Sequence, residues 1–191
     1  MQLGARVTIL PVLVSPADTG YSAPDTGEAL RDGQVVLDRY LGGLSIGYAV
    51  GPPFGDRLVT RGELRRLGLS LGWLRQQAAD YLEAMVDRVR IHGQPPALVP
   101  FFAGAESSLV LATSVWENLA HRVPGQVVIA VPARDVVIVT GSHSPAGLAR
   151  LRREVDRVFA STRRHLLTRD LFIRHGGRWH VYVTAEVSAG R

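Results

Sequence analysis

Two apolar runs in the later half of the chain constrain its fold more than any other feature. Residues 127–131 (VVIAV) and 136–139 (VVIV) flank the tetrapeptide PARD at 132–135. Both runs have the length of a β-strand and are rich in β-branched residues, and the Pro-x-x-Asp sequence between them is typical of a turn. The block therefore predicts a buried hairpin, which leads through Ser144-Pro145 into an amphipathic helix.

Shorter hairpins are predicted on both sides of this block. Gly42-Gly43 separates strand-like residues 35–40 from 44–50, and Gly176-Gly177 separates 170–173 from 179–183. Three further short strands are predicted, over residues 7–14, 97–102 and 108–111.

Capping residues and apolar spacing predict four helices. Thr60 begins a capping-box sequence (TRGE) for a short helix, and Ser70 caps a longer helix that ends before Gly93. Ser114 begins a second capping-box sequence, and Ser144 caps the helix that starts with proline. Together these elements predict an α+β fold: a mainly antiparallel sheet built from hairpins, with two principal covering helices that begin near Ser70 and Ser144.

Composition limits the chemistry available to the chain. Its 191 residues include no cysteine, which excludes a thiolate nucleophile and a cysteine-ligated zinc. The apolar run at 7–14 is too short to span a bilayer and is not followed by a signal-peptide cleavage site. We therefore expect a cytoplasmic protein that does not associate with a membrane, folded as one domain over residues 1–191 with a tail that frays after about residue 187.

The positive charge is concentrated in the later third of the chain. All 22 basic residues are arginine, a pattern that a GC-rich coding bias produces, so the total charge of +5 is weak evidence for nucleic-acid binding. Residues 1–120 hold 10 arginines against 12 acidic residues, whereas residues 121–191 hold 12 against 5. Residues 121–191 are the basic part of the molecule.

Several segments, taken in order, resemble the bacterial YtpQ-like family of unknown function. The segments are Ile9-Leu10-Pro11-Val12, Arg57-Leu58-Val59-Thr60 with Glu63-Leu64 and Leu67-Gly68-Leu69, and above all Val127-Val128-Ile129-Ala130-Val131-Pro132 leading to Asp135-Val136. The resemblance implies one YtpQ-like domain, and it implies no catalytic residues because none is established in that family. It also implies that longer members carry an N-terminal segment that this chain lacks.

The first candidate site is the segment GSHSP at 141–145, which contains Ser142, His143 and Ser144. Backbone N–H groups and two hydroxyls at the start of a helix can hold a phosphate or carboxylate, and Arg150 and Arg153 can add positive charge. The segment lacks the lysine and the glycine spacing of nucleotide-binding loops. A plain capping turn is the alternative interpretation.

The second candidate is the predicted turn that carries Arg134 and Asp135. Two well-formed strands hold this turn, so we expect it to be exposed and able to present both side chains to a partner. The alternative is a turn closed by its own aspartate.

A set of arginines forms the third candidate, on the polar face of the last predicted helix: Arg150, Arg153 and Arg157. With Trp179 or Tyr182 as stacking partners, such a set can contact a nucleic-acid backbone. Two acidic residues interrupt the set, which favours ion pairs within the helix and disfavours nucleic acid as the partner.

The remaining polar residues form no recognisable catalytic or metal-binding motif. Five of the six histidines fall within residues 121–191, without the His-x-x-x-His spacing and glutamate of a zinc enzyme. The Gly-x-Ser-x-Gly sequence of serine hydrolases does not occur, and the acidic residues at 18–32 are typical of a solvated loop. We predict no metal and no cofactor.

These observations predict a non-catalytic interaction module that binds a protein partner or an anionic small ligand through the basic later third. The residues assigned to binding are Arg134, Asp135, Ser142, His143, Ser144, Arg150, Arg153 and Arg157. The alternative function is a hydrolase or transferase that acts on a phosphorylated or other anionic substrate and uses His143 with Ser142 or Ser144. A third hypothesis, compatible with the first, is a homo-oligomer that forms through a strand edge or through Phe101-Phe102.

Overall fold

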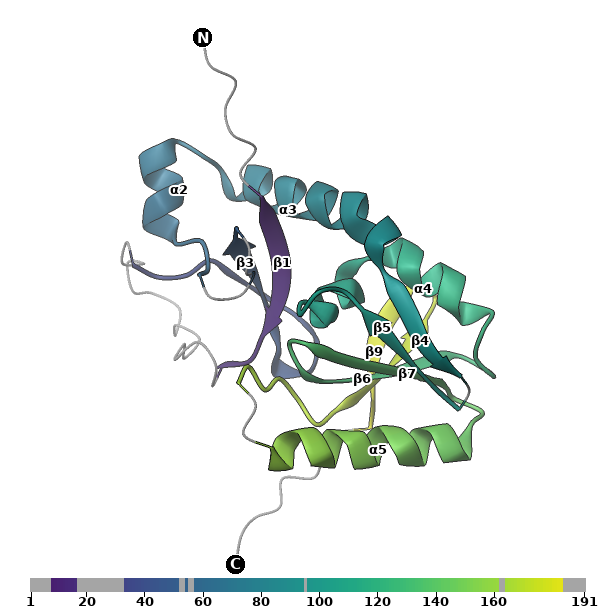
Figure 1. Cartoon of the computed structure of the whole chain (residues 1–191). Coiled ribbons are helices and arrows are strands. Elements are labelled where there is room, and N and C mark those ends of the chain that lie inside the picture. Colours follow the sequence, from purple (N-terminus) through teal and green to yellow (C-terminus); the bar gives the residue numbers. More distant parts are fainter. Residues whose placement is uncertain are drawn as a thin grey trace, which may run out of the picture.

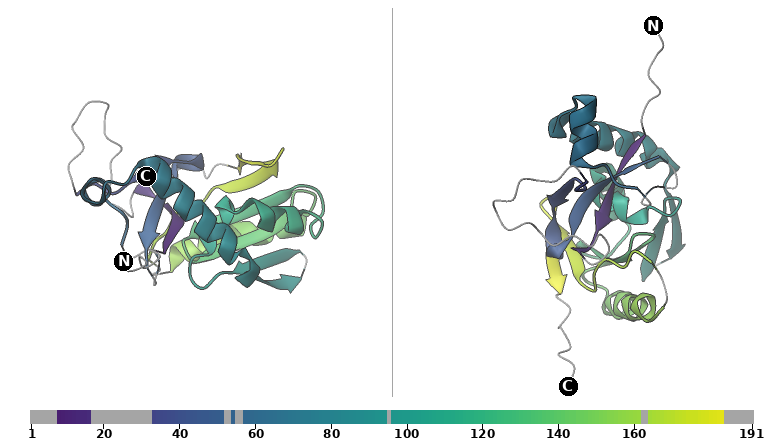
Figure 2. Two further views of the ribbon diagram at one scale, coloured as in Figure 1. Left: turned by 90° about the horizontal axis from the view of Figure 1, so that it is seen from above. Right: turned by 90° about the vertical axis from the view of Figure 1, so that its left-hand side faces the viewer.

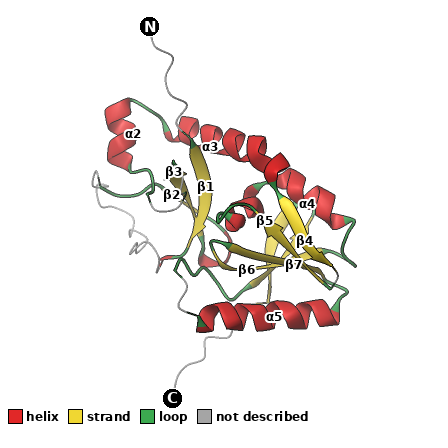
Figure 3. Cartoon of the chain, viewed as in Figure 1, coloured by secondary structure: helices red, strands yellow, loops and turns green. Residues whose placement is uncertain are grey.

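The computed structural model describes residues 8–16, 33–51, 54, 57–94, 96–161 and 164–183. Within these residues the strands form two antiparallel sheets, one of three strands in the order β1-β3-β2 and one of six in the order β4-β5-β7-β6-β8-β9. Helices pack around both sheets (Figures 1 and 3). The predicted α+β fold with mainly antiparallel strands is confirmed.

The elements have the following bounds. The three-stranded sheet contains β1 (Ile9–Val14), β2 (Leu37–Arg39) and β3 (Ser45–Val50). The six-stranded sheet contains β4 (Arg90–Gln94), β5 (Ala97–Phe101), β6 (Val127–Ala133), β7 (Val136–Gly141), β8 (Leu171–His175) and β9 (Arg178–Val183). The α-helices are α2 (Arg61–Leu67), α3 (Leu71–Met85), α4 (Thr113–Ala120) and α5 (Pro145–Ala160), and the 3-10 helices are η1 (Leu41–Gly43), η2 (Val86–Arg88) and η3 (Glu106–Leu111).

The β6–β7 hairpin lies near the middle of the six-stranded sheet and is covered on both faces. Helix α5 packs on one face, where Val128, Ala130 and Ile138 contact Leu151 and Val155. The intervening residues of both strands point into a second cluster that also contains residues of β1, η3 and α4. Burial on both faces explains why the two sequence runs are apolar throughout instead of alternating with polar residues.

The three-stranded sheet packs against α3, which contacts β1 and lies across its direction (Figure 1). Strand β1 is an edge strand, and the proline within it, Pro11, is compatible with that position. Figure 2 shows this sheet and the six-stranded sheet from two further directions. Because the larger core cluster draws residues from both sheets, the two sheets are stabilised together.

Three predicted helix starts are confirmed by their capping hydrogen bonds. The side chains of Thr60, Ser70 and Ser144 accept from the backbone N–H groups of Glu63, Trp73 and Gly147, respectively. Each bond satisfies one of the N–H groups that a helix leaves unpaired at its first turn.

The fourth predicted helix start, the capping box at Ser114, is wrong. Helix α4 begins at Thr113 with Ala112 at the N-cap position and without a side-chain cap. The hydroxyl of Ser114 instead donates to Glu83 Oε2 at 3.0 Å and joins α4 to α3.

Two further predictions need correction. Residues 108–111 belong to the 3-10 helix η3 and not to a strand, because the carbonyl groups of Leu109 and Val110 accept hydrogen bonds from two indole N–H groups and not from a neighbouring strand. The long helix ends at Met85 and not just before Gly93, and the polar residues 90–94 form strand β4 beside β5. The predicted loop after β1 lies mostly outside the described residues, as does the tail after residue 187.

Candidate functional site

Helix α5 covers one face of the six-stranded sheet (Figure 1), and its exposed residues include several arginines. Its inner face is fixed by the burial of Leu151, Val155 and Val158. Residues three and seven positions apart share one face of a helix, so Arg150, Arg153 and Arg157 lie along one side of its exposed surface. We call these three residues the arginine stripe.

The arginines of α5 differ in their partners. Arg157 Nη1 contacts Glu154 Oε1 and Oε2 at 2.9 and 2.8 Å, as the sequence predicted for pairing within the helix. Arg150 and Arg153 form no ion pair within the described residues. Two of the three guanidinium groups of the arginine stripe are therefore available to an external anion.

The other flank of α5 carries a further exposed arginine, Arg152, which the sequence prediction did not include. One turn along, Asp156 Oδ1 accepts from Arg169 Nη1 at 2.9 Å, and the Arg169 guanidinium lies 4.2 Å from the centre of the Phe159 ring. Arg169 therefore neutralises one of the two acidic residues of the helix. Because Arg169 lies outside α5, Asp156 does not neutralise an arginine of the helix itself. The helix surface is therefore more positive than its own sequence indicates.

The segment before α5 is held mainly by hydrogen bonds within the protein. Ser142 Oγ accepts from the backbone N–H of Gln126 at 2.9 Å, and Ser144 is the helix cap. The backbone N–H of His143 donates to the Pro124 carbonyl at 3.1 Å. The His143 imidazole is exposed. Ser142, His143 and Arg153 line none of the three cavities described below.

The turn between β6 and β7 corrects one expectation. Arg134 is only 4 % exposed, although we expected this turn to present it to a partner. Its N–H donates to the His165 carbonyl and its carbonyl accepts from the Ser107 N–H, so two distant segments cover it. Asp135, the next residue, is exposed.

A group of buried polar side chains lies beside this turn. Glu106, Ser107 and Ser108 begin η3 and are at most 3 % exposed. Glu106 Oε1 accepts from the N–H groups of Phe102 and Gly104 at 2.9 and 3.1 Å. The carboxylate therefore supports the turn between β5 and η3.

The cavities lined by described residues include three of about 160 to 270 Å³, and the largest of these three lies where the end of α3 meets β1, β4 and β5. Its volume is about 270 Å³, compared with about 210 and 160 Å³ for the other two. Its apolar lining includes Leu10, Phe54, Tyr81, Met85, Phe101 and Phe102. Two exposed arginines, Arg88 and Arg90, also line it, so an apolar cavity and two cationic groups occur together.

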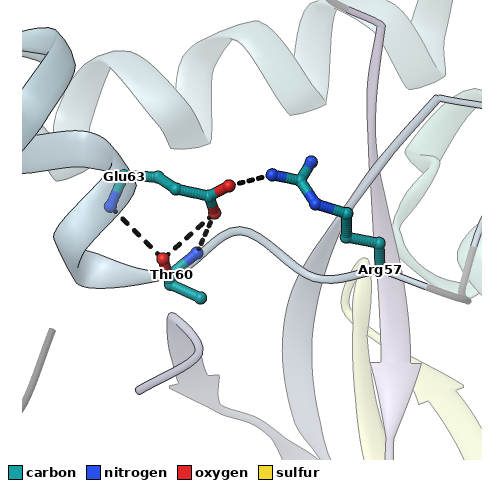
Figure 4. Close-up of polar contacts among 3 residues, drawn as sticks. All are labelled: Arg57, Thr60 and Glu63. Carbon is teal, nitrogen blue, oxygen red and sulfur yellow. Dashed lines mark hydrogen bonds and ion pairs between the residues drawn. The ribbon is translucent and has the colours of Figure 1, made fainter. Parts of the chain in front are cut away.

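The smallest cavity lies beside α2 and the start of α3. It is lined by apolar residues, among them the exposed Leu67 and Trp73, together with the ion pair of Arg57 and Glu63. Figure 4 shows that the same Glu63 carboxylate also accepts from the Thr60 N–H at 2.9 Å in the capping box. Because both groups of this ion pair serve the start of α2, they position the helix.

A carboxylate that accepts hydrogen bonds from an arginine and a tyrosine joins β2, β3 and α3. Arg75 Nε and Nη2 donate to the Asp38 carboxylate at 2.9 and 2.5 Å, and the Tyr48 hydroxyl also donates to it. The hydrogen bonds from Arg75 lower the pKa of Asp38 against the opposing effect of burial. Burial, followed by the hydrogen bond to Asp38, raises the pKa of Tyr48.

The described residues contain no group of three His, Asp or Glu side chains with the geometry to hold a metal ion. His175 and His180 are exposed on the two arms of the last hairpin, with ring centroids 6.4 Å apart. Among the described helices, none has the length and apolar character that crossing a bilayer requires.

Comparisons of the chain with protein-family models, curated proteins and solved structures found no match. The residues that the sequence prediction missed are Arg88, Arg90 and the apolar lining of the largest cavity. No local motif connects them, because they come from five separate elements. The one available signal was Phe101-Phe102, two adjacent aromatic residues at the end of a short strand.

Proposed function

We propose that the protein is a non-catalytic interaction module whose arginine stripe binds an acidic segment of a partner protein. The observation that carries the proposal is the pair of exposed guanidinium groups of Arg150 and Arg153, which have no ion-pair partner among the described residues. Arginine forms bidentate hydrogen bonds with carboxylates, and a helix packed on a sheet holds the groups at fixed spacing. The proposal places the protein in the cytoplasm, and membership of the YtpQ-like family is part of it.

Two features favour an acidic protein segment over nucleic acid. Glu154 and Asp156, which pair with Arg157 and Arg169, interrupt the row of cations on α5 that a continuous phosphate backbone would contact. Trp179, proposed above as a stacking partner, donates its indole N–H to Val110 and packs against Trp116, so its ring already serves the core. A short run of carboxylates can contact Arg150 and Arg153 while avoiding both acidic groups.

The hydrolase or transferase alternative receives no specific support. Catalysis by Ser142 requires a base within hydrogen-bond distance and a cavity for the substrate. Its hydroxyl is bonded to the Gln126 N–H, and neither Ser142 nor His143 lines the cavities described above. The contacts of this segment support a role in joining β7 to α5.

The test is binding of a fluorescent hexaglutamate peptide, measured by anisotropy at low and at physiological salt. We expect the double variant R150Q/R153Q to bind about 5- to 30-fold more weakly, because each exposed ion pair contributes up to about 1 kcal/mol. The matched control R66Q/R178Q removes two other exposed arginines that form no ion pair among the described residues, and it should bind as the wild type does.

Equal affinity of R150Q/R153Q and R66Q/R178Q for the peptide would overturn the proposal, because the charge of the whole molecule would then explain binding. Tighter binding of a single-stranded DNA oligonucleotide than of the peptide would assign the arginine stripe to nucleic acid instead. Both variants should keep the wild-type circular dichroism spectrum, since all four side chains are exposed.

A further inference from the structure

The largest cavity combines an apolar interior with cationic groups on its lining. Leu10 and Phe102 are 1 % and 6 % exposed and form its inner wall, whereas Phe101 is 56 % exposed at its outer edge. The Phe54 and Tyr81 rings pack at a centroid distance of 5.8 Å. Small-molecule sites have mostly apolar walls and a few polar groups, and their volumes begin at roughly 300 Å³, slightly above the volume of about 270 Å³ here.

The two arginines that line the cavity form no ion pair within the described residues. Arg88 ends η2 and Arg90 begins β4, both are exposed, and neither forms an ion pair among the described residues. Asp87, the nearest acidic residue along the chain, pairs with neither of them. Arg90 lies directly opposite Phe101 in the β4–β5 ladder, so a cation and an aromatic ring stand side by side where the cavity opens.

We propose that this cavity is a binding site for a small carboxylic acid with an apolar body, whose chain or ring enters the cavity while its carboxylate binds Arg88 and Arg90. The apolar lining excludes a sugar or a free phosphate as the main occupant, because their hydroxyl or oxyanion groups would lose water without finding partners there. The two unpaired guanidinium groups select an anionic head over a neutral or cationic one. This site is separate from the arginine stripe.

The wall of the cavity is held in a defined shape. Ala103 lines the cavity with a backbone φ of 52°, in the left-handed region that residues other than glycine rarely adopt. The Glu106 carboxylate supports this conformation by accepting from the N–H groups on either side, those of Phe102 and Gly104. Because the wall already has this conformation in the free protein, ligand binding costs less conformational entropy.

The experiment is a titration of the full chain with sodium octanoate, followed by two-dimensional amide NMR, with 1-octanol and octylamine as comparison ligands. We expect saturable shifts confined to the amides of residues that line the cavity and of their immediate neighbours. Octanoate should bind at least about tenfold more tightly than octanol, because the charged head gains hydrogen bonds to guanidinium that the alcohol does not. Octylamine should bind still more weakly.

Two variants test whether octanoate binds in this cavity. R88Q/R90Q should weaken octanoate binding at least about tenfold while leaving octanol binding unchanged, and F101S should weaken the binding of both ligands. All three side chains are exposed, so neither variant should unfold the protein. R66Q/R178Q, which removes two arginines remote from the cavity lining, should bind octanoate as the wild type does.

The proposal is overturned by any of three results: octanol binds as tightly as octanoate, R88Q/R90Q retains wild-type affinity, or octanoate gives no saturable shifts. Sedimentation provides a fourth test. A wild-type dimer that F101S converts to a monomer would mean that a second copy of the chain covers the cavity, which would also overturn the proposal. None of these results bears on the binding of hexaglutamate to the arginine stripe, so the two proposals fail independently.

Discussion

The indole rings of Trp116 and Trp179 meet edge to face, with their centroids 5.0 Å apart and their planes at 86°. Their N–H groups donate to consecutive carbonyls of η3, those of Leu109 and Val110, at 2.6 and 3.0 Å. Trp116 belongs to α4 and Trp179 to β9, so the pair joins a helix and the last strand of the sheet to the same 3-10 helix. Aromatic pairs with this geometry contribute roughly 0.5–1.5 kcal/mol beyond the area they bury.

Trp179→Phe should lower the free energy of unfolding by about 1–2 kcal/mol, because a ring is kept while the hydrogen bond to Val110 is lost. Trp116→Ala should cost about 3–5 kcal/mol, since that side chain is fully buried. Urea denaturation followed by circular dichroism measures both. Trp73→Phe, at a tryptophan that is 37 % exposed, is the control and should change stability by no more than about 0.5 kcal/mol.

The Asp38 carboxylate makes stability depend on acid pH. Its pKa is lower in the folded protein than in the unfolded chain, mainly because of the hydrogen bonds from Arg75. Its contribution is therefore fully present above the unfolded-state pKa of about 3.9 and is lost as the pH falls through the lower folded-state pKa. Asp38→Asn should destabilise the protein at neutral pH and flatten the acid limb of a plot of unfolding free energy against pH.

The Tyr48 hydroxyl makes stability depend on alkaline pH, with a loss of stability as the pH rises. Burial and the hydrogen bond to Asp38 raise its pKa above the usual value of about 10, so the stabilisation it provides is present below pH 10 and is lost as the pH rises further. Tyr48→Phe should reduce the alkaline loss of stability while leaving the acid limb in place. An unchanged alkaline limb in this variant would contradict the assignment.

Two helical glycines form a matched pair for substitution by alanine. A Cβ at Gly147 in α5 would overlap Thr140 Oγ1 and lie 2.6 Å from the Pro96 carbonyl oxygen. A Cβ at Gly72 in α3 would meet nothing closer than Ser70 Oγ, at 3.7 Å. Gly72→Ala should therefore stabilise the protein by about 0.5 kcal/mol through helix propensity, whereas Gly147→Ala should destabilise it by about 1–3 kcal/mol because α5 must move off β7. Thermal unfolding of the two variants side by side distinguishes the effects.

Arg134 should behave as a core residue in spite of its charge. We expect Arg134→Met to cost at least about 2 kcal/mol, because the side chain is 4 % exposed and its replacement disturbs a tightly packed, buried charged group. Arg150→Met, an exposed arginine on α5, should change stability by no more than about 0.5 kcal/mol in the same urea titration. Equal stability of the two variants would contradict a structural role for Arg134.

The parts of the fold that the sequence predicted are those determined by neighbouring residues. Thr60, Ser70 and Ser144 cap their helices through groups three residues away, and the β6–β7 hairpin follows from two β-branched runs and the turn between them. Residues 108–111 were predicted wrongly because their conformation depends on indole groups from α4 and β9, which no local pattern reveals. Strand β4 was missed because its mostly exposed, polar residues form a strand only beside β5.

The candidate sites also divide into those set by neighbouring residues, which the sequence predicts, and those set by distant residues, which it does not. The arginine stripe was predictable because residues 150, 153 and 157 have helical spacing within one element. The burial of Arg134 was not predictable from the sequence, since Ser107 and His165 cover that turn from distant parts of the chain. The proposed carboxylate site between Arg88, Arg90 and Phe101 was also hidden, because the chain has to fold before these residues share one cavity.

The packing of Gly42 against Phe172 has a consequence for biosynthesis. Gly42 lies in η1, between β2 and β3, and a Cβ there would come within 2.9 Å of the Phe172 ring in β8, near the other end of the chain. Translation proceeds from the amino terminus, so the first sheet leaves the ribosome exit tunnel well before the strand that completes its packing. We therefore expect the nascent chain to expose β1 and β3 until β8 has been synthesised, and to depend during that interval on chaperones that shield apolar segments.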